Sequence, residues 1–245
     1  MTLLSVNVNK IALLRNSRGR DYPSVTGFVE TCLGLGVKGV TVHPRPDERH
    51  VRRQDVHDIA ALLKDRAGVE FNIEGYPSAE FLDLVLTVQP AQCTLVPDQP
   101  GQLTSDHGWD VSANQKLLKE VTSRLRDAGI RSSLFLDPDV EAVQRVPAAG
   151  ADRIELYTEE YAEAYGTGEQ SKVWEKYHAA AASALQAGLG VNAGHDLNLD
   201  NLADFLQIPG IQEVSIGHAL VVEALHLGIG TVIQKYLAIV ANTSR

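Results

Sequence analysis

Short runs rich in β-branched residues alternate with longer segments of helical period along the whole chain. Eight such strand–helix units share 245 residues, about 30 residues each, which is the usual spacing of parallel strands joined by helices. The expected strands are Leu3–Asn9, Gly39–Pro44, Glu70–Glu74, Cys93–Pro97, Ser132–Asp137, Arg153–Thr158, Gly190–His195 and Glu213–Gly217. The expected helices, several of which end before Gly or Pro, are Thr26–Leu35, Gln54–Leu63, Ala79–Val88, Gln115–Ala128, Glu141–Ala149, Val173–Ala187, Asn201–Leu206 and Ala219–Val240.

Eight units predict a closed (β/α)8 TIM barrel, an α/β fold that typically takes about 250 residues. The alternative is an open doubly wound sheet, but this fold usually has five or six strands and would leave two units unused. No linker rich in Ser, Gly or Pro divides the sequence. We therefore expect a single barrel domain over residues 1–245.

The charge balance limits the partners that the chain can have. There are 22 Lys and Arg against 31 Asp and Glu, a formal net charge of -9, which argues against nucleic acid or an anionic membrane as the main partner. No apolar run approaches the roughly 20 residues that span a bilayer, and no signal peptide is evident. The two cysteines, Cys32 and Cys93, lie in apolar runs and are expected to be buried thiols. These features predict a cytoplasmic enzyme.

Polar residues gather at the ends of the expected strands, while the strand bodies are mainly apolar. The functional residues of such barrels lie at the carboxyl ends of the strands. His43, His195 and His218 end three separate strands, which favours a shared site over isolated surface histidines. Glu74 follows apolar residues, and a buried carboxylate must be paired or neutral. Glu155 has two equal interpretations, a site carboxylate or an ion-pair partner of Arg153.

Basic residues cluster in two places despite the acidic composition, which predicts anion sites. One cluster follows the first strand and the other follows the second, where part of it fits a solvated helix face. Gly194 and Gly217 would allow a phosphate to approach the backbone closely. Two anion sites would suit two phosphorylated substrates. The clustered residues are Arg15 and Arg18, then Arg45, Arg49, Arg52 and Arg53.

Other chemistries are less well supported by the spacing. A metal site built from His43, Glu74, His195 and Asp196 lacks the paired-histidine patterns of strong metal motifs, so no metal is predicted. A Schiff base needs a lysine in the site, and Lys10 is the only lysine near the carboxyl end of a strand. The polar segment Asp98–Asp110 has the character of a mobile lid after the fourth strand.

Five segments, in order along the chain, resemble pyridoxine 5'-phosphate synthases. They are residues 6–19, 41–50, 72–74, 191–195 and 215–219, including the run His-x-Arg-x-Asp-x-Arg-His at 43–50. The resemblance implies a (β/α)8 barrel that condenses 1-deoxy-D-xylulose 5-phosphate with 3-amino-2-oxopropyl phosphate. The products are pyridoxine 5'-phosphate, inorganic phosphate and water, and no cofactor or metal is needed. It also implies a homo-octamer built from dimers.

The resemblance assigns roles to individual positions. It implies that His43 and Glu74 accept protons, that His195 donates one, and that Glu155 stabilises a transition state. The residues implied to hold deoxyxylulose phosphate are Arg45, His50 and Thr104, with Asn9 and Lys10 nearby. Those implied to hold the aminoketone phosphate are Asn7, Arg18, Asp196, Gly217 and His218.

The chain departs from the commoner family pattern at a few of these positions. Many members have Asp-His where this chain has Asn9-Lys10, and many have Gly where it has Asp196. The Thr-Gly that often follows the sixth strand is Thr158-Glu159. Two other functions stay open: another phosphate-binding barrel isomerase or aldolase, and a non-catalytic phosphometabolite-binding protein.

Overall fold

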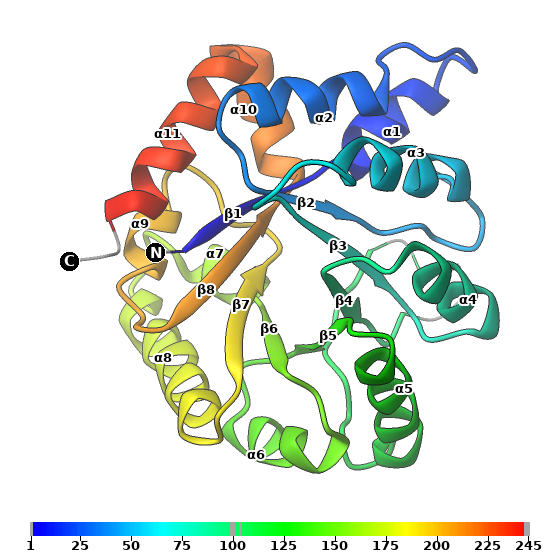
Figure 1. Cartoon of the computed structure of the whole chain (residues 1–245). Helices are drawn as coiled ribbons and strands as arrows, with labels where there is room; N and C mark the ends of the chain where they lie inside the picture. Colours follow the sequence, from blue (N-terminus) through cyan, green and yellow to red (C-terminus); the bar gives the residue numbers. More distant parts are fainter. Residues whose placement is uncertain (1, 99–100, 103, 243–245) are drawn as a thin grey trace.

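A computed structural model of the protein describes residues 2–98, 101–102 and 104–242. Eight parallel strands close into a barrel in sequence order, with β1 hydrogen-bonded to both β2 and β8. The ring is seen in Figure 1. This confirms the predicted (β/α)8 architecture. The strands are β1 (Leu3–Asn7), β2 (Gly39–Val42), β3 (Glu70–Gly75), β4 (Gln92–Leu95), β5 (Arg131–Leu136), β6 (Arg153–Tyr157), β7 (Gly190–Gly194) and β8 (Ile211–Ile216).

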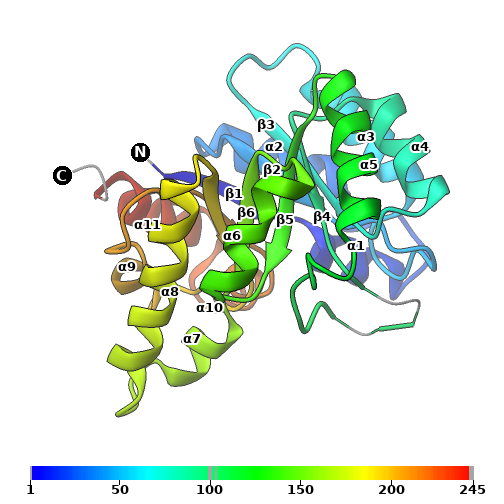
Figure 2. The ribbon, with the colours of Figure 1, turned by 90° about the horizontal axis from the view of Figure 1, so that it is seen from below.

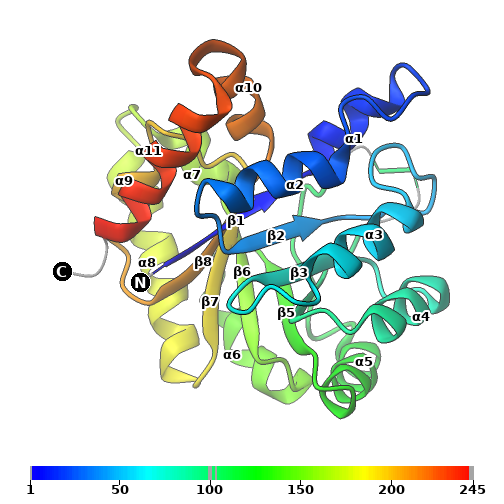
Figure 3. The ribbon, with the colours of Figure 1, turned by 45° about the horizontal axis from the view of Figure 1, so that its top comes forward.

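Helices cover the outside of this ring, and α8 lies on the opposite side of the barrel from α3 and α4 (Figures 2 and 3). They are α1 (Asn9–Asn16), α2 (Val25–Gly34), α3 (Arg53–Leu63), α4 (Ala79–Val88), α5 (Gln115–Asp127), α6 (Val140–Ala149), α7 (Glu159–Ala164), α8 (Gln170–Gln186), α9 (Leu202–Phe205), α10 (His218–Leu227) and α11 (Ile229–Asn242). None of these described helices is long and apolar enough to cross a bilayer.

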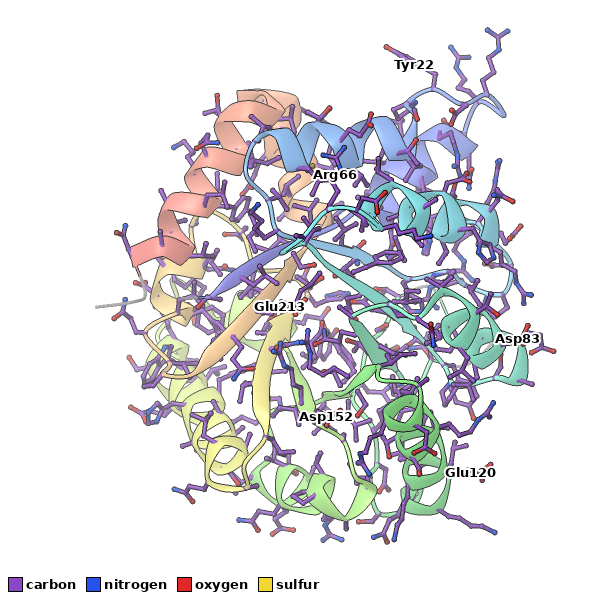
Figure 4. The ribbon with its side chains drawn as sticks, in the orientation of Figure 1. Tyr22, Arg66, Asp83, Glu120, Asp152 and Glu213 are labelled. Carbon is purple, nitrogen blue, oxygen red and sulfur yellow. The ribbon has the colours of Figure 1, made fainter. Side chains whose placement is uncertain are left out.

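The interior of the barrel is polar, which corrects the expectation that strand bodies are mainly apolar. Hydrogen bonds cross between strands that are not neighbours: Gln92 Nε2 to Glu213 Oε2 at 3.3 Å, and Thr94 Oγ1 to Glu155 Oε2 at 3.2 Å. Side chains alternate between the two faces of a strand, so their neighbour Cys93 faces the helices and is fully buried there. Figure 4 shows Glu213 within the ring of strands.

The apolar core therefore lies between the outer face of the strands and the helices. Ile73 and Leu134 on the strands and Leu118 and Tyr177 on the helices are fully buried in one continuous cluster. Several helices begin with a side-chain cap, such as Ser78, whose hydroxyl accepts the backbone N–H of Phe81. This packing fixes the strands, so the residues at their carboxyl ends have a rigid base.

Most expected boundaries differ from the structure by one to three residues, α1 and α7 were not expected, and two differences change how the chain is arranged. The first strand ends at Asn7, and Asn9 already begins α1. The last helix is broken at Gly228, whose φ of 79° is left-handed, because a residue in that region cannot continue an α-helix. The expected lid, Asp98–Asp110, is irregular where it is described, and residues 99, 100 and 103 of it lie outside the described residues.

Candidate active site

The carboxyl end of the barrel brings His43, Glu74 and Asn7 together, while the contacts of His195 are with other residues of this end. His43 follows β2, Glu74 lies at the end of β3, and His195 follows β7. His43 Nδ1 is 4.0 Å from Glu74 Oε2, and Asn7 on β1 donates to the same oxygen at 3.4 Å. Three neighbouring strands thus supply one compact group.

His43 and Glu74 both favour their uncharged forms. Burial lowers the pKa of His43 well below its usual range, and the positive charges of Arg45 and other basic groups lower it further. Burial raises the pKa of Glu74 well above its usual range, and repulsion from Glu155 adds to this. At neutral pH the imidazole can accept a proton and the carboxyl group can release one.

Glu155 is buried inside the barrel, and its charge acts on Glu74. Burial, followed by repulsion from Glu213, raises the pKa of Glu155 to about 8. Thr94 Oγ1 donates to it. Arg153 instead bonds Asn192 at 3.1 Å and lies 3.6 Å from Glu213. Of the two interpretations of Glu155, these contacts favour the site carboxylate.

Gly194 makes room for Glu155. A Cβ built on Gly194 would clash with Glu155 Oε1, at a separation that real Cβ atoms do not show. The two residues lie diagonally on the paired strands β6 and β7, where Glu155 pairs with Asn192, two residues before Gly194. A side chain at position 194 would displace this carboxyl group, so glycine at this position allows Glu155 to lie where it does.

Asp98, which no sequence motif marks, is a buried residue of the site. Its Oδ2 atom accepts from Arg45 Nη2 at 2.6 Å and from Ser105 Oγ at 2.8 Å, and it lies 3.9 Å from His43 Nε2. Its Oδ1 atom has no hydrogen-bond partner among the described residues. The only sequence signal was a charged residue directly after the fourth strand.

A cavity of about 660 Å³ opens beside His43, Arg45 and Asp98. It extends past the loops that follow β2, β3 and β4, and Arg49 also lines it. This volume is within the range of small-molecule sites. The described part of the chain therefore offers a substrate-sized space next to His43 and the guanidinium group of Arg45.

The ring of His50 lies edge-on to that of His43, with centroids 6.3 Å apart. Its hydrogen bonding also defines its tautomer. The backbone N–H of Val51 donates to His50 Nδ1 at 2.9 Å, so the neutral ring carries its proton on Nε2. Burial and the charges of Arg45, Arg49 and Lys10 lower the pKa of His50 to about 4. His50 is therefore a neutral donor at pH 7, suited to an anion.

Asn9 and Lys10 take different places at the start of α1. Asn9 Oδ1 accepts the backbone N–H of His43 at 2.9 Å, and its own N–H donates to Asn7 Oδ1 at 3.0 Å. Asn9 thus ties the end of β1 to the end of β2. Lys10 is exposed on the first turn of the helix.

Residues expected near the aminoketone phosphate are only partly brought together. Gly217 precedes α10 and a Cβ there would be 3.0 Å from Asn7 Cβ, while the exposed His218 begins the helix. Arg18 lies on the segment between α1 and α2, which extends away from the barrel together with Tyr22 (Figure 4). In the described chain, Arg18 does not join the other members of this group.

Arg15 corrects the prediction of an anion site after the first strand. Its guanidinium is buried and pairs with Asp55, with Nη2 to Oδ2 at 2.8 Å. A second contact joins Nη1 to Asp55 Oδ1. Arg15 also donates to the backbone oxygen of His50 at 3.3 Å. This arginine holds α1 to the loop before α3, so it is structural.

The suggested metal ligands do not form a metal site. His195 Nδ1 is 2.7 Å from Asp196 Oδ2, and His195 Nε2 is 3.0 Å from Thr104 Oγ1. Within residues 2–98, 101–102 and 104–242, no group of three or more His, Cys, Asp and Glu is arranged to hold a metal ion. Thr104, a residue with little signal of its own, does meet His195 at this end of the barrel.

Residues 4–242 match the family model described as "Pyridoxal phosphate biosynthesis protein PdxJ". The chain belongs to this family. A pyridoxine 5'-phosphate synthase from Bacteroides thetaiotaomicron is 54% identical over 237 residues, which cover 96% of this chain and 98% of that protein. Another, from Albidiferax ferrireducens, is 49% identical over 247 residues and 98% of each chain.

Solved structures of other families share the fold. The YdjI aldolase from Escherichia coli K12 is 12% identical, with a TM-score of 0.60 over 99% of this chain and 88% of its own. Monomers of phosphoribosylanthranilate isomerase from Thermotoga maritima are 12% identical, with a TM-score of 0.57 over 99% and 100%. At such identities the likeness concerns the barrel alone.

The residues that depart from the commoner PdxJ pattern have clear partners in the structure. Asn9 supports the backbone of His43, Asp196 bonds His195, and Glu159 accepts from the hydroxyl of Tyr157. None of these three carboxyl or amide groups is left without a partner. The departures therefore alter the surroundings of the two histidines and leave the histidines in place.

Proposed function

We propose that this chain is a pyridoxine 5'-phosphate synthase. It would condense 1-deoxy-D-xylulose 5-phosphate with 3-amino-2-oxopropyl phosphate to give pyridoxine 5'-phosphate, inorganic phosphate and water, without a cofactor or metal. The observation that carries the proposal is the buried pair His43 and Glu74, held 4.0 Å apart, in which His43 also lines a substrate-sized cavity. Membership of the PdxJ family selects this reaction among those that such a pair could serve.

The reaction consists mainly of proton transfers. The amine of the aminoketone attacks the ketone of the sugar phosphate, and loss of water forms a C=N bond. Elimination of phosphate from the sugar part and addition of water follow, and ring closure with loss of two further waters completes the reaction, so that one phosphate and two waters are released overall. We assign proton acceptance to His43 and Glu74 and proton donation to His195. Glu155 would stabilise charge that develops deeper in the barrel.

Burial raises the pKa of Glu74 and so favours its protonated form, and Glu74 can act as a base only after losing this proton. A substrate ammonium group beside Glu74 and Glu155 would favour the carboxylate, because an opposite charge nearby stabilises the ionised form. The aminoketone substrate has such a group. Its arrival would thus activate Glu74, while His43 is ready to accept a proton throughout.

We assign the two phosphates to different sides of the mouth. Deoxyxylulose phosphate would be held by Arg45, His50 and Thr104, with Asn9 and Lys10 nearby. The aminoketone phosphate would be held by Asn7, Gly217 and His218, with the backbone N–H of Asp196, and Arg18 would reach it from a neighbouring subunit. Support comes from the neutral His50 donor and from the N-terminus of α10, a helix of 10 residues, whose dipole favours an anion.

The proposal is tested by incubating the purified chain with both substrates and measuring pyridoxine 5'-phosphate and phosphate release. The wild-type protein should form both. His43→Ala should lower the rate by about 10²- to 10⁴-fold, while the matched control His57→Ala, on the exposed face of α3, should not. Binding of both substrates without product would favour the phosphometabolite-binding protein. Turnover of one sugar phosphate alone would favour an isomerase or aldolase.

We also propose that the chain is one cytoplasmic domain that assembles into a homo-octamer built from dimers. Large apolar side chains are exposed on two helices that pack together, α1 and α10. Leu14 is 53% exposed and Leu225 is 78% exposed. Light scattering of the purified chain would measure the assembly, and Leu225→Glu should reduce its mass if α10 lies in an interface.

A further inference from the structure

The imidazole of His195 is held on three sides. Asp196 Oδ2 lies 2.7 Å from Nδ1, and Thr104 Oγ1 lies 3.0 Å from Nε2. The ring of Tyr157 meets it edge-on, with centroids 5.1 Å apart and an interplanar angle of 77°. The ring is therefore oriented by neighbours from three different loops or strands before any substrate binds.

The backbone after β7 is shaped to bring Asp196 back onto this ring. His195 and Asp196 have φ values of 82° and 56°, a region that non-glycine residues rarely adopt. Thr158 Oγ1 donates to the carbonyl of Gly194 at 2.8 Å, and Asn201 Nδ2 donates to that of Asp196 at 3.2 Å. These bonds hold two consecutive unusual residues in a defined turn.

The contact with Asp196 decides which ring nitrogen carries the proton. A carboxylate only accepts hydrogen bonds, so Nδ1 must be the donor. In the neutral ring Nε2 is then the bare nitrogen, and in the charged ring Nε2–H is the group left to donate. Hydrogen bonding by His195 and the charges of His218 and Lys10 lower the pKa of Asp196, so its carboxylate is the form that faces the ring.

A second carboxylate supports the same ring through Tyr157. The hydroxyl of Tyr157 donates to Glu159 Oε2 on α7, which fixes the ring that packs against His195. Glu159 and Asp196 are the two positions where this chain has a carboxylate and many family members have glycine. Both carboxylates thus act on the surroundings of one histidine.

We propose that Asp196 is a positioning residue that fixes the Nδ1–H tautomer of His195 and directs Nε2 toward the reacting molecule. The side chain of Asp196 serves the histidine, and only its backbone N–H remains for a phosphate. The inference rests on the proposed function, because it takes His195 as the proton donor: Nε2 first accepts a proton while Asp196 holds Nδ1–H, and the charged ring then donates that proton from Nε2. The inference predicts that the Asp196 side chain affects the chemical step and does not affect substrate binding.

The test compares Asp196→Gly and Asp196→Asn with the matched control Asp200→Asn, an exposed residue a few positions along the chain. Glycine is at ease at positive φ, so Asp196→Gly should fold. Nitrogen-15 NMR of the histidine rings reports the tautomer in each protein without substrate. Steady-state kinetics with both substrates report kcat and KM separately.

We expect the Nδ1–H tautomer of His195 in the wild type, in Asp196→Asn, whose side-chain oxygen still accepts, and in Asp200→Asn. Asp196→Gly should release the ring to the Nε2–H tautomer and lower kcat about 10- to 100-fold, the usual effect of losing a partner of a functional histidine, with KM for the aminoketone unchanged. An unchanged tautomer in Asp196→Gly would overturn the inference. A rise in KM without loss of kcat would also do so.

A failure of the proposed function would give different results from a failure of the inference about Asp196. If the wild type forms no pyridoxine 5'-phosphate, or if His195→Ala turns over normally, His195 is not the proton donor of this reaction. The NMR result does not depend on turnover and still decides whether Asp196 sets the tautomer. The two conclusions can therefore fail separately.

Discussion

Replacing Glu155 by Gln should make the protein less sensitive to rising pH. Glu155 is buried, and its pKa is raised from the usual 4.5 to about 8. Gln has nearly the shape of the protonated carboxyl group, and its side-chain oxygen can still accept from Thr94 Oγ1. The substitution therefore keeps the neutral form of the site and removes the ionisation.

The size of the effect follows from proton linkage. A carboxyl group with a raised pKa contributes stability that is fully present below the pKa of the unfolded chain and is lost as the pH rises through the folded value. The window for Glu155 runs from 4.5 to about 8. With about 1.4 kcal/mol for each pKa unit, the wild type should lose about 3 kcal/mol between about pH 5 and about pH 8 that the Gln variant keeps.

The assay is urea unfolding at several pH values across this window, followed by circular dichroism at one protein concentration. Glu120→Gln is the matched control, because Glu120 lies on the outer face of α5 and is exposed (Figure 4). Its curve should run parallel to that of the wild type. If Glu155→Gln also ran parallel to the wild type across the whole window, the buried, protonated state of Glu155 would be refuted.

Three further substitutions test other parts of the site. Glu74→Gln should lower kcat by about 10²- to 10⁴-fold with an unchanged circular dichroism spectrum, and normal turnover would exclude Glu74 as a base. Gly217→Val should raise KM for the aminoketone more than for deoxyxylulose phosphate, because the added Cβ would lie 3.0 Å from Asn7 Cβ; equal changes for both substrates would move the phosphate elsewhere. Arg15→Ala should lower the free energy of unfolding by about 3–5 kcal/mol, since it leaves Asp55 buried without its ion-pair partner; a loss below about 1 kcal/mol in urea unfolding would contradict this.

Most of the fold, and the proximity of His43 and Glu74 in the candidate site, could be predicted from the sequence. The alternation of strand and helix periods depends on local patterning, and barrel closure then places the ends of successive strands side by side. His43 and Glu74 therefore had to meet once the strands were assigned correctly. The polar interior was harder to see, because Gln92 and Thr94 alternate with apolar residues and each strand is short.

What could not be predicted depends on contacts between distant segments. Arg15 looks like an anion ligand until its helix is seen to pack on Asp55. Asp98 carries no motif, and its importance appears only when Arg45 and Ser105 are found bonded to it. The break at Gly228 depends on a left-handed residue in a segment whose apolar pattern continues on both sides.

The missing Cβ of Gly194 has an evolutionary consequence. Because a methyl group there would clash with Glu155 Oε1, position 194 can gain a side chain only if the Glu155 carboxyl group moves or is removed, and the mutational effects at the two positions should be epistatic. Gly194→Ala should be harmful in the wild-type background but tolerated in combination with Glu155→Ala, which removes the carboxyl group. Lineages that keep the carboxyl group on β6 in this position should therefore favour glycine on β7, so one backbone position carries the constraint for a side chain on the neighbouring strand.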